Sequence, residues 1–114
     1  MTDTTLTSQR VGELTVVRIS GEITSATSSG LQDRLLPLIG QGASLLVDLT
    51  AVPYISSAGL RTMLLAHRRA QEVGAAIRLF GLSDEVRFVM SATGFLAFFH
   101  IGEDLETELG RARS

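Results

Sequence analysis

The stretch LLVDLTAVPYISSAGLR, residues 45–61, decides the fold of this chain. Its first half is an apolar run of strand length that ends at a turn containing Pro53, and its second half opens a segment with helical spacing of apolar residues. A strand, a short loop and a helix start therefore meet at Ser56 and Ser57. We expect Ser56 to cap the helix and Ser57 to be its first residue, and capping alone is the simpler interpretation of both serines.

Upstream of this stretch, the sequence predicts a β-hairpin followed by a helix. Residues 6–11 and 14–19 are rich in strand formers and flank the turn-like pair Gly12-Glu13. Candidate helix caps in residues 25–29 precede an apolar stripe at Leu31, Leu35, Leu38 and Ile39. Because proline lacks a backbone N–H donor, we expect Pro37 to kink or shorten the last turn of this helix.

The apolar run at residues 43–49 predicts a strand that is central to a sheet, with Asp48 near its exit. The helix that follows should extend from Ser57 to about Val73, with an apolar arc formed by Leu60, Met63, Leu64, Ala66, Ala70 and Val73. The opposite face carries Arg61, Leu65, Arg68, Arg69 and Glu72. An exposed leucine among arginines, next to the two serines, suggests a docking surface.

Residues 75–80 predict a fourth strand, and Ser83, Asp84 and Glu85 provide a cap and an acidic first turn for a third helix. An aromatic strand or strand-like segment is expected at residues 94–101, followed by a short helix that begins with Glu103, Asp104, Glu106 and Glu108. The expected fold class is α/β, a mixed sheet of four to five strands packed against four helices. We expect residues 1–114 to form a single domain.

Composition excludes several classes of function. The 114 residues include 10 basic residues, all arginine, and 12 acidic ones, so no broad basic field favours nucleic acid. The absence of cysteine and lysine excludes thiolate nucleophiles and Schiff-base chemistry, and no metal-ligand spacing or cofactor motif occurs. Without a signal peptide or an apolar run of membrane length, we expect a soluble protein of the cytoplasm that does not contact a membrane.

Ser57, Asp84 and His100 follow the chain order of an α/β-hydrolase triad, which is the pattern of a serine hydrolase. The nucleophile elbow Gly-x-Ser-x-Gly is missing, and the chain is under half the usual size for that fold. We therefore expect no catalytic residue. A phosphorylatable hydroxyl beside a partner-sized face is typical of a switch.

Four segments resemble the STAS domain family of sulfate transporters and anti-sigma factor antagonists. Residues 52–60, VPYISSAGL, look like the family's phosphorylation loop, usually Asp-Ser-Ser-Gly-Leu or Asp-Ser-Thr-Gly-Leu. Residues 21–23 resemble the Gly-Glu-Leu-Asp that ends the second strand, and residues 80–86 fall where the fourth strand turns into the third helix. Residues 92–95 match the glycine and aromatic step before the last strand.

The resemblance implies an anti-sigma factor antagonist. Its unphosphorylated form would capture an anti-sigma factor that is also a serine kinase, and a PP2C-type phosphatase would reverse the phosphorylation. Ser57 falls on the family's phosphoacceptor, while Ser56 replaces the family's Asp and becomes a rival acceptor. Thr24 replaces a second family Asp near the loop. Together with the outer helix face beside the loop, the residues expected to bind the partner are Glu22, Thr24, Tyr54, Ser56, Ser57, Ala58, Gly59, Arg61, Leu65 and Arg68.

Two other functions remain open at this point. A non-phosphorylated STAS adaptor would use the same loop only for docking, and kinase-dependent phosphate on the loop separates it from the switch. A STAS module that binds a small molecule or lipid would instead need a closed apolar cavity.

Overall fold

The computed structural model describes residues 4–42 and 44–102 of the 114-residue chain. In chain order the elements are β1 (Thr5–Val11), β2 (Leu14–Ser20), α1 (Ser28–Leu35), the 3₁₀ helix η1 (Leu36–Gly42), β3 (Ser44–Ala51), α2 (Ser57–Glu72), β4 (Ile77–Phe80), α3 (Asp84–Ala92), the 3₁₀ helix η2 (Phe95–Phe98) and β5 (His100–Ile101).

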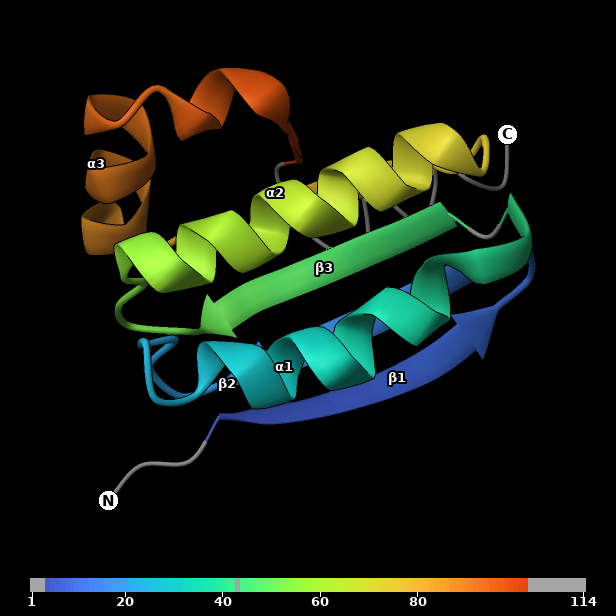
Figure 1. Ribbon diagram of the computed structural model, residues 1–114, viewed down its shortest axis with the longest axis horizontal. Coiled ribbons are helices and arrows are strands. Elements are labelled where there is room, and N and C mark those ends of the chain that lie inside the picture. Colours follow the sequence, from blue (N-terminus) through green and yellow to red (C-terminus); the bar gives the residue numbers. More distant parts are fainter. Residues whose placement is uncertain (1–3, 43, 103–114) are drawn as a thin grey trace.

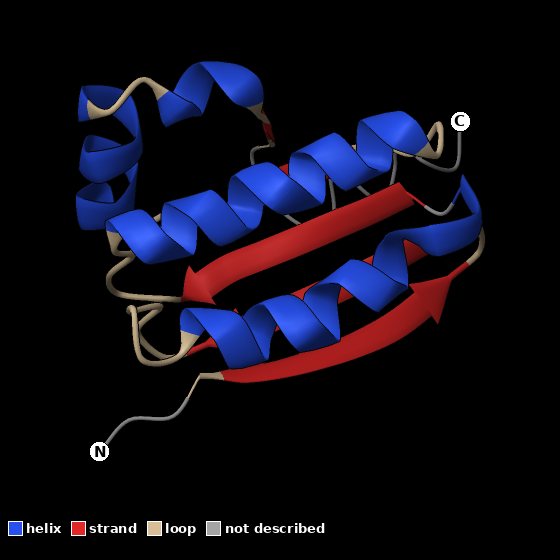
Figure 2. Cartoon of the chain, in the orientation of Figure 1, coloured by secondary structure: helices blue, strands red, loops and turns tan. Residues whose placement is uncertain are grey.

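The five strands form one mixed sheet in the order β1-β2-β3-β4-β5. β1 and β2 are the antiparallel hairpin that the sequence predicts, and each later strand is parallel to the one before it. Because right-handed crossovers between successive neighbours keep the connecting helices on one face, α1 and α2 lie side by side over the same side of the sheet (Figure 1). The strands form the layer beneath these two helices (Figure 2).

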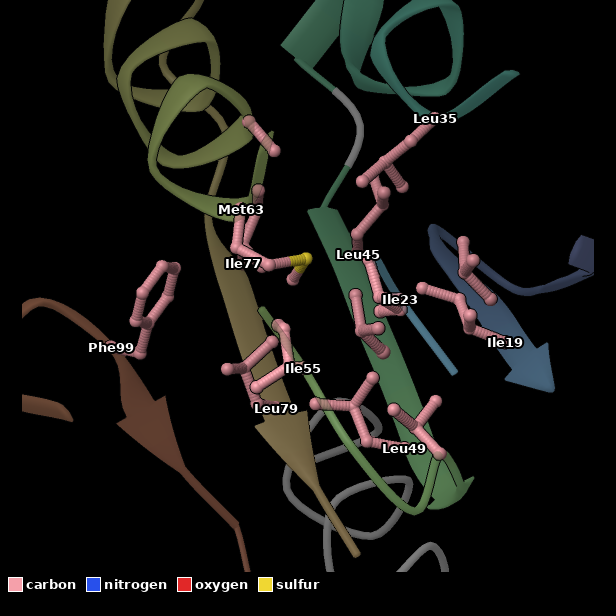
Figure 3. Close-up of a cluster of buried hydrophobic side chains, with 14 of the residues drawn as sticks. Ile19, Ile23, Leu35, Leu45, Leu49, Ile55, Met63, Ile77, Leu79 and Phe99 are labelled. Carbon is pink, nitrogen blue, oxygen red and sulfur yellow. The ribbon is translucent and has the colours of Figure 1, made fainter. Parts of the chain in front are cut away.

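The main core lies between this sheet face and the helices. Alternate residues of β3, Leu45, Val47 and Leu49, belong to it and are fully buried, as the period of two in a strand requires. α2 contributes Leu60, Met63, Ala66 and Ala70 from its predicted apolar arc. Figure 3 shows side chains from the strands, from α2 and from the loops converging in this layer.

The intervening residues of the strands form a second, smaller cluster on the other face of the sheet. Leu14, Leu46 and Phe80 are buried there, with Val16 packed against them. Asp48 has the same parity as Leu46 in β3 and is also buried, although it is charged.

The helix boundaries follow the sequence signals closely. α2 starts at Ser57 and α3 at Asp84, each with the expected serine as its N-cap. The α-helical part of the first helix ends at Leu35, and the segment with Pro37 continues as η1, so the prediction that proline shortens this helix is confirmed. The fourth strand is shorter than expected: the Ala75 N–H donates to the Ala70 carbonyl of α2 at 2.8 Å, and β4 begins only at Ile77.

The prediction of a fifth strand over residues 94–101 is largely wrong. Gly94 has a φ of 81°, residues 95–98 form η2, and only His100 and Ile101 pair with β4. Ring packing accounts for the difference: Phe95 contacts Phe98 with ring centroids 6.2 Å apart, and His67 of α2 contacts Phe99 at 5.4 Å. The aromatic residues that favour a strand in the sequence thus hold a helical turn against α2.

Three α-helices and two 3₁₀ helices lie within residues 4–42 and 44–102. The expected C-terminal helix, beginning around Glu103, lies outside the described residues.

Candidate functional site

Ser56 and Ser57 have different environments at the start of α2. Ser56 is the N-cap with an extended backbone, and its hydroxyl accepts a hydrogen bond from the Gly59 N–H at 3.2 Å. Its carbonyl accepts from the Leu60 N–H at 2.9 Å. Ser57 is the first helical residue and is exposed, while Ser56 is half-buried. The expected division between a capping serine and a first helical serine is confirmed.

The loop before α2 is joined by backbone hydrogen bonds to the loop between β2 and α1. The Ile23 N–H donates to the Tyr54 carbonyl at 3.0 Å, and the Ser56 N–H donates to the Ile23 carbonyl at 2.8 Å. Ile23 and Ile55 form an isolated parallel bridge. The exposed side chain of Glu22 and the half-buried side chain of Thr24 therefore flank the strand-like segment that ends at Ser56.

Gly59 lies where the first turn of α2 packs against both loops. It is buried, and a Cβ atom at this position would lie 2.6 Å from Ile23 Cγ2 and 2.8 Å from Ile55 Cγ1. Both isoleucines are fully buried, so neither carbon atom can move away without disturbing the core. The absence of a side chain at residue 59 allows α2 to start beside the joined loops.

Thr24 stabilises its own loop. Among the described residues, its side chain forms no hydrogen bond with Ser56 or Ser57. Its hydroxyl accepts from the Ala26 N–H at 3.2 Å, and its N–H donates to the Thr27 hydroxyl at 3.0 Å. Thr27 is the N-cap of α1 but makes no side-chain cap. The N-cap lies within residues 25–29 as expected, but the hydroxyl of Thr27 donates to the Glu22 carbonyl upstream of the helix and does not cap α1.

The outer face of α2 adjoins Ser57 at the start of the helix. Arg61 and Arg68 are exposed as predicted, and Tyr54 before the helix is 39% exposed. Leu65 is half-buried, so the expectation of a fully exposed leucine is wrong. Ala58 is half-buried as well. The first turn of α2 has no acidic side chain.

Two polar side chains that support this region, Asp48 and Thr62, were not assigned a role from the sequence. Asp48 is 3% exposed; its Oδ1 accepts from the Thr50 N–H at 2.9 Å and the Thr50 hydroxyl at 2.6 Å, and its Oδ2 accepts from Arg18 Nε at 3.0 Å. Thr62 is buried on the core side of α2, and its hydroxyl donates to the Ser28 carbonyl at 3.4 Å. The sequence signal that could have identified Asp48 and Thr62 is a polar residue at a position where the pattern of apolar residues predicts burial.

Burial alone would raise the pKa of Asp48, but the hydrogen bonds from Thr50 and Arg18 and the charge of Arg18 outweigh it. The net result is a pKa below the ordinary value of 3.8. The carboxylate is therefore ionised at neutral pH and fixes Thr50, two residues before the loop at Val52.

Within residues 4–42 and 44–102, no group of three or more His, Cys, Asp or Glu side chains could hold a metal ion. None of the helices described has the length and apolar character required to cross a bilayer.

Comparison with known proteins identifies the family. The model of the STAS domain matches residues 5–108. BtrV of Bordetella bronchiseptica, a candidate anti-sigma factor antagonist, is 31% identical over 102 residues, which cover 89% of this chain and 88% of BtrV. The anti-sigma-B factor antagonist of Bacillus subtilis is 32% identical over 78 residues, covering 68% of this chain and 72% of that protein.

Solved structures give the same fold. The anti-sigma factor antagonist SpoIIAA in its unphosphorylated form has a TM-score of 0.73 at 20% identity, covering 96% of this chain and 99% of that one. The phosphorylated form of SpoIIAA, a Bacillus cell fate determinant, has a TM-score of 0.71 at 19% identity, covering 96% of this chain and 100% of that one. At these identities the structural similarity shows the fold alone. The family model and the two sequence relatives show the family. This chain belongs to the STAS domain family.

Proposed function

We propose that this protein is an anti-sigma factor antagonist controlled by phosphorylation of Ser57. Its unphosphorylated form binds an anti-sigma factor that is also a serine kinase, which frees a sigma factor for transcription. The kinase transfers the γ-phosphoryl group of ATP to Ser57 Oγ, which loses its proton, and ADP is released. A PP2C-type phosphatase reverses the modification, and the cycle takes place in the cytoplasm.

The observation that carries this proposal is the exposed Ser57 at the first position of α2, within the family's loop motif. The names of BtrV and of the anti-sigma-B factor antagonist support the antagonist role. The phosphorylated form of SpoIIAA supports a phosphate switch in this fold. The protein acts as a regulator that binds its partner, not as a catalyst.

Ser57 is a better phosphoacceptor than Ser56 for a structural reason. The hydroxyl of Ser56 accepts the Gly59 N–H, and a phosphate there would have to replace this cap. The hydroxyl of Ser57 takes part in no recorded side-chain hydrogen bond among the described residues, and its side chain is exposed to an approaching kinase.

The switch works through charge at the docking surface. A phosphoserine adds about −1.5 to −2 charge at neutral pH. The positive end of α2 tolerates this charge, whereas a partner surface that packs closely on the loop must desolvate it. The difference in partner affinity between the hydroxyl and the phosphate can therefore release the partner without a change of fold.

The proposed docking surface combines the two joined loops with the outer face of α2. The backbone hydrogen bonds between Ile23, Tyr54 and Ser56 keep the loops in one position relative to each other. The residues assigned to this surface are Glu22, Thr24, Tyr54, Ser56, Ser57, Ala58, Gly59, Arg61, Leu65 and Arg68. Of these, Gly59 is buried and contributes by allowing the helix start to pack against the loops.

The test is partner capture from the native cell, followed by incubation of the captured kinase with ATP and by peptide mass spectrometry. We expect phosphate on Ser57, constitutive binding by Ser57→Ala, and binding by Ser57→Asp that is weaker by about tenfold or more. Ser56→Ala is the matched control and should still be phosphorylated and released. Phosphate found only on Ser56 would reverse the assignment of the two serines.

A docking-only adaptor is the second candidate, because Ser56 and Thr24 stand where the family has acids and the loop lacks the negative charge beside the acceptor. Binding of a partner that never phosphorylates either serine would favour it.

A further inference from the structure

Arg61 lies one helical turn beyond Ser57 on the surface of α2. Both residues belong to the continuous helix Ser57–Glu72, and both side chains are exposed. Residues four positions apart on a helix are surface neighbours, with Cβ atoms about 6 Å apart. A phosphate on the Ser57 hydroxyl is therefore within reach of the Arg61 guanidinium.

Arg61 has no acidic partner among the described residues. The ion pairs recorded in the described part of the chain join Arg18 to Asp48 and Arg69 to Glu72. No Asp or Glu occurs between Asp48 and Glu72 in the sequence. The first turn of α2 thus has no anion, and Arg61 follows directly after it, whereas α3 has Asp84 and Glu85 in its first turn.

We propose that Arg61 binds the phosphate of phosphorylated Ser57 within the same helix and so stabilises the phosphorylated form of the domain. This inference rests on the proposed function, in which Ser57 is the phosphoacceptor. It adds to that function the role of Arg61, which holds the phosphate on Ser57 after the partner has dissociated.

The geometry suits such a pair. An anion that precedes a cation by four residues has the favoured orientation on a helix, and the phosphate itself would lie at the positive end of the α2 dipole. A guanidinium can give two parallel N–H donors to phosphate oxygens. The exposed Glu22, next to the Ile23 that pairs with Ile55 in the loop before α2, opposes the phosphate by its charge, and Arg61 offsets it.

The interaction also gives a reason why the switched-off state would last. A phosphate held by Arg61 has to leave the guanidinium before a phosphatase can coordinate it. We therefore expect slower dephosphorylation in the native sequence than in an Arg61→Gln variant.

The experiment uses the full chain with phosphoserine incorporated at position 57 during translation, so that no kinase is needed. The second pKa of the phosphate is measured by phosphorus NMR in the native sequence, in Arg61→Gln and in Arg68→Gln. Arg68 is the matched control, because it is exposed on the same helix face but lies about 16 Å along the axis from Ser57, beyond the Debye length in physiological salt.

We expect Arg61→Gln to raise this pKa by about 0.3 unit, since the cation favours the dianion, and we expect Arg68→Gln to leave it unchanged. In ~1 M salt the difference should largely disappear. Equal pKa values in the native sequence and in Arg61→Gln, or an equal rise in both variants, would refute the proposal. Because no partner is present, failure of the proposed function would instead be seen as absence of kinase-dependent phosphate on Ser57.

Discussion

Gly59 is the residue at which the fold and the site depend on each other. Its lack of a side chain lets the helix that carries Ser57 start against Ile23 and Ile55, which join the two loops. No positive φ is involved here, so the requirement for glycine is one of space. A larger residue would have to move α2 away from the loops or displace a core isoleucine.

We expect Gly59→Ala to lower the free energy of unfolding by about 2 kcal/mol, and Gly59→Val to lower it further, because the added atoms overpack a fully buried contact. Chemical denaturation measures the change. Gly30→Ala is the matched control: Gly30 lies in α1, and an added Cβ meets nothing within 4 Å. There the substitution should stabilise the protein by about 0.5–1 kcal/mol. Equal effects at both positions would contradict the spatial argument.

Asp48 makes stability depend on pH. Its pKa is lower in the folded protein than its ordinary value of 3.8, so the unfolded chain takes up the proton first as the pH falls. The stabilisation is therefore complete above about pH 5 and is lost as the pH falls through 3.8 toward the folded pKa.

Asp48→Asn should lower the free energy of unfolding at pH 7 by about 1–3 kcal/mol, because the amide cannot accept from Arg18 and Thr50 with both of its polar atoms. The deficit should narrow below pH 4, which denaturation curves across the pH range would record. Asp33→Asn, at an exposed position of α1, should have no comparable effect. A deficit that is independent of pH would show that the charge of Asp48 is not the cause.

At the scale of the element, α2 combines a structural cap with the proposed docking surface. Ser56→Ala should lower stability by about 1 kcal/mol through loss of the cap to the Gly59 N–H. Ser56→Asp, which restores the family's residue, should keep the cap and add a favourable charge at the helix N-terminus. Thermal unfolding of the two variants compares them directly. A midpoint for Ser56→Asp as low as that for Ser56→Ala would argue against capping by this side chain.

Leu65 tests the outer face of the same helix. Because Leu65 is half-buried, Leu65→Ala is preferable to a charged substitution and should cost about 1 kcal/mol of stability. Leu64→Ala, at the adjacent half-buried leucine, should cost a similar amount. If the outer face contacts the partner, only Leu65→Ala weakens capture of the anti-sigma factor. Equal capture by both variants would confine the interface to the loops.

Local signals were sufficient to predict α2 and α3. A serine cap, an apolar arc of period 3.6 and a terminal glycine lie within a short stretch of sequence, and the helices begin where these signals place them. The segment at Phe95–Phe98 could not be predicted in this way, because its conformation depends on contacts with His67 of a distant helix. The environment of Leu65 likewise depends on neighbours that periodicity along one helix does not include.

At the scale of the whole molecule, the mixed sheet and its central β3 followed from the order of predicted elements, since short right-handed connections leave few alternatives. The set of residues that meet at the two joined loops could not be predicted from the order of elements. Ile23 and Ile55 are adjacent only because β2 and β3 are parallel neighbours, so the pairing that brings Glu22 and Thr24 to the serines is a tertiary property. The family resemblance suggested this proximity, and periodicity alone could not.

The strand order β1-β2-β3-β4-β5 has a consequence for how the protein is made. Every strand pairs with the strand synthesised just before it, so no pairing has to wait for a segment from the far end of the chain. No pairing therefore spans more than one helical connection, although each parallel pair still joins residues far apart in the sequence, such as Leu14 and Ser44, and parallel pairing of this kind slows folding. During synthesis the hairpin, α1 and β3 all leave the ribosome before α2, so the serine proposed to control the protein is added after the first three strands of the sheet are present.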